Sequence, residues 1–349
     1  MSAADSNSLT LRRPDDFHVH LRDGEHMVTA AAFTAAQFAR ALIMPNLKPP
    51  VTTTAQALQY RQRVLAALGP NTDFNPLMSL YLTNNTSPSE IKAAKASGHV
   101  VGCKLYPAGA TTNSDAGVTA IENIYPVLEV MEREGLVLQV HGEVTASEVD
   151  VFDRETAFID RVLSPLTQRF QSLRVVFEHI TTQRAVDFVK QSRKGVAATL
   201  TPQHLLHNRN AIFQGGVRPH YYCLPILKRE SDRQALLQAA TSDDARFFLG
   251  TDSAPHARHT KENACGCAGM FSAHAALELY AEAFESVGKL DKLEAFASER
   301  GADFYQVPRN TGTVTLTRQS WTPPAWYEFG KDQLVPMRAN ENISWRLHR

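Results

Sequence analysis

Eight apolar runs rich in β-branched and aromatic residues recur along the chain, with segments of helical character between them. The runs are Asp16–Leu21, Ala41–Met44, Phe74–Leu82, Val100–Leu105, Leu136–His141, Val175–His179, Ala197–Leu200 and Phe247–Gly250. Strands that alternate with helices pair in parallel, and eight such units can close into a barrel. The sequence therefore predicts an α/β fold, specifically a (β/α)8 TIM barrel.

Several of the intervening segments carry helix signals. Thr54–Leu68 is rich in helix-favouring residues and stops at a Gly-Pro pair, while Ser87 and Pro88 form an N-cap and a first-turn proline. Further helices are expected at Ile124–Glu134, Thr181–Gln191 and Ser231–Ala240.

The C-terminal part of the chain is expected to pack on the barrel. Two helical stretches are predicted after Ser272, the first to about Val287 and the second from Leu290 to Arg300. The tail from Gly312 alternates and is aromatic, which indicates short strands or extended chain. With no repeat or linker, residues 1–349 are expected to form a single domain.

Composition excludes several classes of protein. The 36 Lys and Arg residues balance 36 Asp and Glu residues, so no global field attracts nucleic acid or an acidic membrane. Residues 1–7 lack signal-peptide features, and no apolar run approaches the roughly 18 residues of a membrane span. Four cysteines form no disulfide framework, so we expect a cytoplasmic protein, with Cys265 and Cys267 as free thiols rather than half a metal site.

Six polar residues lie at or near the C-terminal ends of five predicted strands, where TIM barrels build their active sites. They are His18, His20, Lys104, His141, His179 and Asp252. His18 and His20 are two positions apart, so both rings should point to one side of a strand while Val19 points to the other. The spacing is too long for a local metal-binding loop, and only a closed fold would gather these side chains.

Imidazole and carboxylate are good ligands for Zn²⁺ and similar ions, so the set predicts a site for two divalent metals. Lys104 is the unusual member because an ammonium group cannot ligate a cation. Burial and a nearby dication lower a lysine pKa, and a free amine can add CO2 to become a carbamate. Lys104 as a salt-bridge or substrate-binding lysine remains open, as does an accidental pairing of His18 with His20.

Longer motifs surround these residues and carry a family resemblance. They are Asp16-Phe17-His18-Val19-His20-Leu21-Arg22-Asp23-Gly24, Met44-Pro45-Asn46-Leu47, Gly102-Cys103-Lys104-Leu105-Tyr106-Pro107, Gln139-Val140-His141-Gly142-Glu143, Phe177-Glu178-His179-Ile180 and Gly250-Thr251-Asp252-Ser253-Ala254-Pro255-His256. In this order they resemble the dihydroorotases of the amidohydrolase superfamily, in the shorter bacterial type. The resemblance extends over nearly the whole chain.

The resemblance implies the reversible interconversion of N-carbamoyl-L-aspartate and (S)-dihydroorotate in de novo pyrimidine (UMP) biosynthesis. It implies two Zn²⁺ ions per subunit, bridged by N6-carboxylysine at Lys104. One ion would be bound by His18, His20 and Asp252, and the other by His141 and His179. A metal-bridging hydroxide would attack the ring amide, with Asp252 as general base and then general acid. A homodimer is implied as well.

Arg22, Asn46 and His256 are expected to bind the substrate carboxylate, because a guanidinium fork matches a carboxylate. The family adds contacts from His20 and His141 and from the backbone at Leu224 and Ala268. A mobile loop over Tyr106–Asp115 would touch the substrate through Thr111 and Thr112. Simpler roles stay open: Arg22 paired with Asp16 or Asp23, Asn46 as a turn residue, and the two threonines as ordinary loop residues.

Two other functions remain to be weighed against this one. A hydantoinase, dihydropyrimidinase or allantoinase would share the metal chemistry, but its substrates lack the free carboxylate that Arg22, Asn46 and His256 suit. A non-catalytic relative, kept as a scaffold in a larger complex, would be expected to have lost metal ligands, whereas all six candidates are present here.

Overall fold

The computed structural model describes residues 7–348 of the chain. Residues 1–6, which contribute to the argument against a signal peptide, lie outside the described residues. A parallel eight-stranded sheet forms the centre of the molecule, with its strands in chain order. They are β2 (Asp15–Val19), β3 (Arg40–Ile43), β4 (Asn75–Tyr81), β5 (Val100–Leu105), β6 (Val137–Val140), β7 (Val175–Phe177), β8 (Val196–Leu200) and β9 (Phe247–Leu249).

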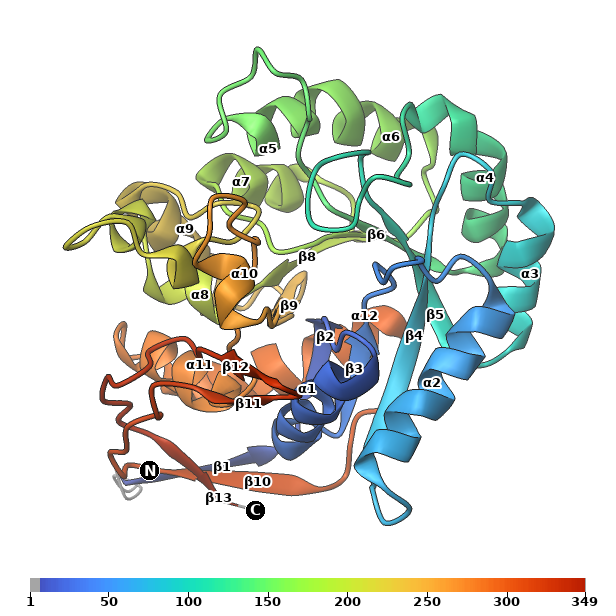
Figure 1. Ribbon diagram of the computed structural model, residues 1–349. Coiled ribbons are helices and arrows are strands. Elements are labelled where there is room, and N and C mark those ends of the chain that lie inside the picture. Colours follow the sequence, from blue (N-terminus) through green and yellow to red (C-terminus); the bar gives the residue numbers. More distant parts are fainter. Residues whose placement is uncertain (1–6, 349) are drawn as a thin grey trace.

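The sheet curls into a barrel that closes between its first and last strands (Figure 1). Here the Asp252 amide donates to the His18 carbonyl at 2.8 Å, and the His20 amide donates to the Ser253 carbonyl at 3.0 Å. All residues of β3, β6, β7, β8 and β9 are buried, as expected when helices cover a parallel sheet. The TIM barrel and all eight strands are therefore confirmed.

Helices surround the barrel strands and their rim (Figure 1). They are α1 (Gly24–Gln37), α2 (Thr54–Leu68), α3 (Pro88–Ala96), α4 (Tyr125–Glu134), α5 (Arg154–Phe158), α6 (Ser164–Arg169), α7 (Gln183–Gln191), α8 (Pro202–Leu206), α9 (Glu230–Ala240), α10 (Arg258–Lys261) and α11 (Ala276–Glu285). The predicted helix at Thr54–Leu68 is confirmed with the same bounds, because a Thr53–Gln56 capping box begins it and Gly69 ends it. Helix α1 was not predicted from the sequence. Neither were α5 and α6, nor the π-helix Ile159–Leu163 between them.

The second C-terminal helical stretch differs in form from the prediction. It is helical as predicted, but it begins as a 3₁₀ helix at Leu290–Lys292 and continues as a π-helix at Ala295–Glu299, and its α-helix, α12 (Arg300–Tyr305), runs past the expected end. The Tyr305 ring stacks on Phe17 inside the barrel at 4.8 Å, and both belong to an apolar cluster of interior strand residues. Helix α12 thus plugs the N-terminal end of the barrel and leaves the opposite rim for polar side chains.

The tail packs on the barrel as predicted, through two small sheets. Strand β10 (Thr313–Thr317) pairs with β1 (Ser8–Arg12) and β13 (Arg346–His348), and β11 (Tyr327–Phe329) pairs with β12 (Asp332–Leu334). Strand β1 was not predicted from the sequence. No helix within residues 7–348 is both long enough and apolar enough to cross a membrane.

Candidate active site

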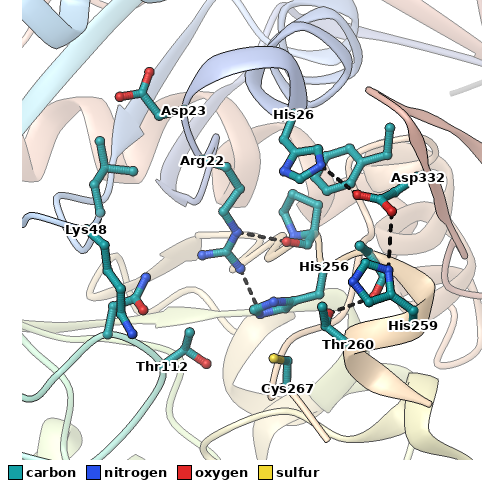
Figure 2. Close-up of a pocket in the computed structure, with 15 residues that line it drawn as sticks. Arg22, Asp23, His26, Lys48, Thr112, His256, His259, Thr260, Cys267 and Asp332 are labelled. Carbon is teal, nitrogen blue, oxygen red and sulfur yellow. Dashed lines mark hydrogen bonds and ion pairs between the residues drawn. The ribbon is translucent and has the colours of Figure 1, made fainter. Parts of the chain in front are cut away.

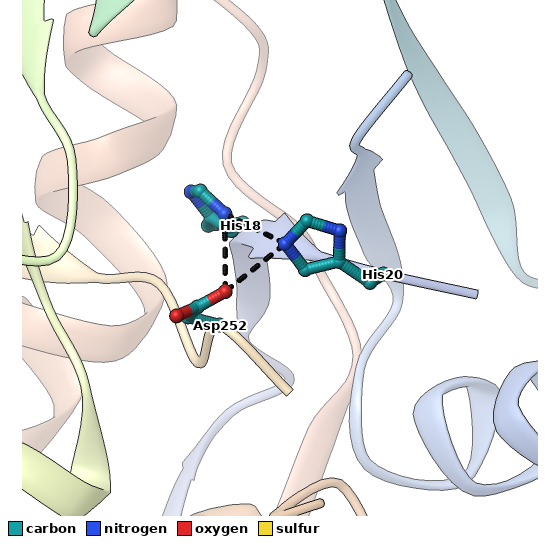
Figure 3. A group of neighbouring side chains, drawn as sticks. All are labelled: His18, His20 and Asp252. Atoms are coloured by element: carbon teal, nitrogen blue, oxygen red, sulfur yellow. Dashed lines mark hydrogen bonds and ion pairs between the residues drawn. The ribbon is translucent and has the colours of Figure 1, made fainter. Parts of the chain in front are cut away.

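Three predicted metal ligands meet at the C-terminal rim of the barrel (Figure 3). Nε2 of His20 lies 3.3 Å from Nε2 of His18 and 3.0 Å from Oδ1 of Asp252, and His18 Nε2 lies 3.3 Å from the same oxygen. All three residues are buried and their donor atoms can hold one metal ion. We call His18, His20 and Asp252 the first ligand group.

The local backbone explains how β2 and β9 bring these residues together. The pairing of β2 with β3 shifts register between Asp16 and Val19, so Phe17 packs in the barrel interior while His18 also turns toward the rim. Val19 packs outside the barrel, as predicted. Gly250 allows β9 to approach closely, because a Cβ there would lie 3.1 Å from that of His18.

Lys104, His141 and His179 lie beside the first ligand group, and we call them the second ligand group. The His179 ring centroid is 4.9 Å from those of both His18 and His141. Among residues 7–348, neither Nδ1 of His179 nor Nζ of Lys104 has a hydrogen-bond partner, although both are buried. Cys103 points away into the outer core, so alternation along β5 turns Lys104 inward.

Burial and neighbouring groups together set the charge states of this cluster. Burial and Lys104 would lower the pKa of His18, but the contacts with Glu178 and Asp252 raise it. It lowers the pKa of Lys104 to about 8, against the attraction of Glu178 and Asp252, so a free amine becomes accessible. Burial also lowers the pKa of His20 to about 4 and that of His179 well below its usual range, which favours neutral rings. Burial alone would raise the pKa of Asp252, but hydrogen bonds with His18 and His20 hold it well below its usual value.

These observations fit divalent metal ions and a modified lysine. Neutral imidazoles and an ionised carboxylate are the protonation states that ligate metal. A buried amine without a partner is costly unless another group completes it. Lys104 has the position and the lowered pKa that carbamate formation requires.

Two carboxylates whose role was not predicted from the sequence, those of Glu178 and Glu143, fix the orientation of the histidines. Glu178 Oε2 contacts Nδ1 of His18 at 2.8 Å and accepts from the Thr199 hydroxyl at 2.6 Å, while Glu143 Oε2 contacts Nε2 of His141 at 2.8 Å. Such contacts determine which ring nitrogen faces a metal. Both acids lie within two residues of a predicted ligand, and that adjacency was the available signal.

Arg22 lies beside the first ligand group and lines the same cavity. Strand β2 ends at Val19, and a left-handed backbone at Arg22, with φ 65°, turns its side chain inward. Its Nε donates to the Pro255 carbonyl at 2.8 Å, and Nη2 lies 2.9 Å from His256 Nε2 (Figure 2). Within residues 7–348 Arg22 pairs with neither acid considered above, because Asp23 pairs with Arg63 and Asp16 accepts from the amide and hydroxyl of Thr251.

Asn46 joins a metal-ligand candidate to the neighbouring loop. Its Oδ1 lies 2.8 Å from Nδ1 of His20, and its Nδ2 donates to the Thr112 carbonyl at 3.1 Å. The Asn113 side chain donates to the Asn46 carbonyl at 2.9 Å, and the Thr112 hydroxyl donates to the Ala268 carbonyl at 3.4 Å. The loop therefore lies over the rim, bonded to both sides of it.

One small cavity at the rim is lined by most of the predicted site residues. It includes His18, His20, Arg22, Asn46, Thr111, Thr112, His141, His179, Leu224, Asp252 and Ala268. His256 lines the adjoining outer cavity instead. The inner cavity has only about 20 Å³, close to the space for one water, so the loop must move to admit a larger molecule.

Comparison with known proteins shows the family of the chain. The model of the amidohydrolase family matches residues 16–318. A dihydroorotase from Delftia acidovorans is 64% identical over 344 residues, 99% of each chain. The chain belongs to the dihydroorotase family of amidohydrolases.

Solved structures of family members have the same overall fold. A dihydroorotase from Campylobacter jejuni is 35% identical, with a TM-score of 0.91 over 99% of each chain. A dihydroorotase from Saccharomyces cerevisiae in complex with 5-fluoroorotic acid is 33% identical, with a TM-score of 0.88 over 98% of each chain. An L-hydantoinase from Arthrobacter aurescens shares the fold alone. It is 16% identical, with a TM-score of 0.80, and the match covers 97% of this chain and 82% of the hydantoinase chain.

Proposed function

We propose that this protein is a zinc-dependent dihydroorotase that interconverts N-carbamoyl-L-aspartate and (S)-dihydroorotate in pyrimidine biosynthesis. The observation that carries the proposal is the Arg22 guanidinium in the same cavity as the first ligand group. This pairing places a carboxylate-binding fork beside a site for hydrolytic metal chemistry. A hydantoinase substrate lacks the free carboxylate that Arg22 would bind.

The residues present suit two zinc ions. The first ligand group would hold one ion, and His141 and His179 the other, with a CO2-derived carbamate on Lys104 between them. Glu178 and Glu143 support this arrangement because each binds the ring nitrogen on the far side of His18 and His141. When bound, the ions supply a hydroxide near neutral pH and polarise the amide carbonyl.

Substrate binding falls to side chains and backbone around the cavity. Arg22, Asn46 and His256 take the carboxylate that remains outside the reacting amide, with His20 and His141 also in contact. The backbone at Leu224 and Ala268 holds the ring, and Thr111 and Thr112 contact the substrate when the loop is closed. Closure also excludes bulk water, which strengthens each of these polar contacts.

Asp252 moves the proton. Its Oδ1 faces His18 and His20. Oδ2 is therefore left to accept the proton of the attacking hydroxide and to return it to the leaving ring nitrogen. The His18 and His20 contacts hold the pKa of Asp252 well below its usual value, so the group begins as the carboxylate that a general base requires.

Ultraviolet assay of dihydroorotate hydrolysis by zinc-loaded protein tests this function, with N-carbamoyl-L-aspartate assayed for the reverse direction. Turnover of both compounds, lost with a chelator and restored by zinc, is the expected result. Absence of turnover with both would overturn the proposal. Turnover of hydantoin, dihydrouracil or allantoin in place of dihydroorotate would favour the related hydrolases instead.

Elemental analysis separates an enzyme from a scaffold. The scaffold alternative predicts near-zero zinc after careful purification, whereas the proposed enzyme retains about two ions per chain. The homodimer implied by the family and the cytoplasmic location expected from the sequence stay predictions. Size-exclusion chromatography with light scattering tests the homodimer.

A further inference from the structure

A second cavity, of about 420 Å³, adjoins the small cavity at the metal-ligand rim. Arg22 and Thr112 line both cavities, so the outer one is the space immediately outside the loop. Figure 2 shows the Arg22 guanidinium between Lys48 on one side and His256 on the other. Any molecule that approaches the rim from this side passes these groups.

The acidic side chains of the outer cavity are already bound to cations or histidines. Asp23 accepts from Nε and Nη2 of Arg63 at 3.0 and 2.8 Å. Asp332 lies between two rings, with one oxygen 3.1 Å from Nε2 of His26 and the other 3.2 Å from Nδ1 of His259. Neither carboxylate is therefore directed at an incoming ligand.

Lys48 differs from these groups. Its side chain is exposed and has no ion-pair partner within residues 7–348. Within residues 7–348, the Arg22 side chain makes its contacts through Nε and Nη2, so Nη1 is still available. The outer cavity therefore presents two cationic groups, and the acids beside them are engaged elsewhere.

We propose that Lys48, with Arg22, makes the outer cavity a docking site for dicarboxylates. This rests on the proposed function, in which N-carbamoyl-L-aspartate carries two carboxylates and dihydroorotate carries one. Arg22 takes the carboxylate that survives in both compounds. Lys48 attracts the second carboxylate of N-carbamoyl-L-aspartate while the loop is open. The substrate then moves to the metal-ligand rim and the loop closes.

The loss of affinity on removal of the Lys48 charge should differ between a dianion and a monoanion, and this difference can be measured. Across a cavity of this size, with charges about 8 Å apart in water, one ammonium group changes the affinity for a carboxylate about twofold. Two carboxylates double the interaction free energy, so the loss for a dianion is about the square of the loss for a monoanion, about fourfold. Salt removes the effect, because the screening length falls from about 10 Å at 0.1 M to about 3 Å at 1 M.

Steady-state rates of the two substrates cannot reveal the unequal effect of Lys48 on dianions and monoanions. A substitution leaves the reaction equilibrium unchanged, so kcat/KM must fall by the same factor in both directions. Inhibition constants of unreactive anions are free of that constraint. Succinate supplies two carboxylates, and orotate at pH 7 supplies one.

The experiment compares zinc-loaded wild-type protein with Lys48→Ala, Lys48→Arg and Lys92→Ala. Lys92 is an exposed lysine on α3 and does not line the cavity, so it controls for net charge. At low ionic strength, Lys48→Ala should raise the inhibition constant of succinate about fourfold and that of orotate about twofold. Lys48→Arg and Lys92→Ala should match wild type, and at 1 M salt all four proteins should agree.

Unchanged constants in Lys48→Ala would overturn the proposal. So would equal losses for the two anions, a loss that persists in high salt, or the same loss in Lys92→Ala. Wild-type turnover of both substrates keeps this outcome separate from the proposed function. If wild type hydrolyses dihydroorotate and Lys48→Ala binds succinate equally well, only the docking site fails.

Discussion

Replacement of Arg22 by methionine removes the proposed carboxylate contact while keeping a long side chain. The Arg22 side chain is held by Pro255 and His256, so its guanidinium is oriented before a substrate arrives. One hydrogen bond between charged groups contributes about 1.5–3 kcal/mol, and a two-bond fork about 3–5 kcal/mol. At about 1.4 kcal/mol per tenfold, kcat/KM for dihydroorotate should fall about 100- to 3,000-fold.

The assay is ultraviolet detection of dihydroorotate hydrolysis, with zinc content measured on the same samples. Arg184→Met is the matched control, since Arg184 forms a surface ion pair with Asp160 at 2.8 Å, away from the site. The inhibition constant of dihydrouracil, which lacks the carboxylate, should change little in Arg22→Met. A fall in kcat/KM of less than threefold for dihydroorotate, or an equally weakened inhibition by dihydrouracil, would refute the assigned role.

Three further predictions address other parts of the molecule. Glu178→Gln should weaken zinc binding about 10- to 100-fold in chelator competition, because the carboxylate that orients His18 is lost; an affinity within twofold of wild type would contradict this. Asn113→Ala should increase proteolysis within residues 107–118, because a loop hydrogen bond is lost, and unchanged cleavage would show that this bond does not hold the loop. Tyr305→Ala should reduce the free energy of unfolding in urea by about 3–5 kcal/mol because its stack on Phe17 is lost, whereas Tyr305→Phe should cost less than about 1 kcal/mol. A loss below about 1 kcal/mol in the alanine variant would contradict the role of α12 in closing the N-terminal end of the barrel.

The barrel strands were predictable because each is buried on both sides. A parallel strand covered by helices reads as a short apolar run, and β5 was found with its observed bounds. Helix α1 was missed because five of its residues are buried and it lacks a clear polar face. Strand β1 was missed because its partner, β10, lies about 300 residues away and no local pattern reveals that pairing.

The ligand candidates were predictable from their positions at strand ends, whereas their supporting contacts were not. Sequence spacing cannot show that Glu178 crosses the barrel to His18, because that contact depends on closure between β2 and β9. The inward turn of Arg22 depends on a left-handed backbone conformation that is uncommon outside glycine. Tertiary geometry decides these features.

Anomalous scattering at the zinc edge, from crystals of zinc-loaded protein, tests most directly whether the site holds two zinc ions and a modified Lys104. We expect two peaks, one at the first ligand group and one at His141 and His179, with carboxylate density beyond Nζ of Lys104. A map with no peak at the first ligand group, or with an unmodified amine on Lys104, would contradict the proposed centre.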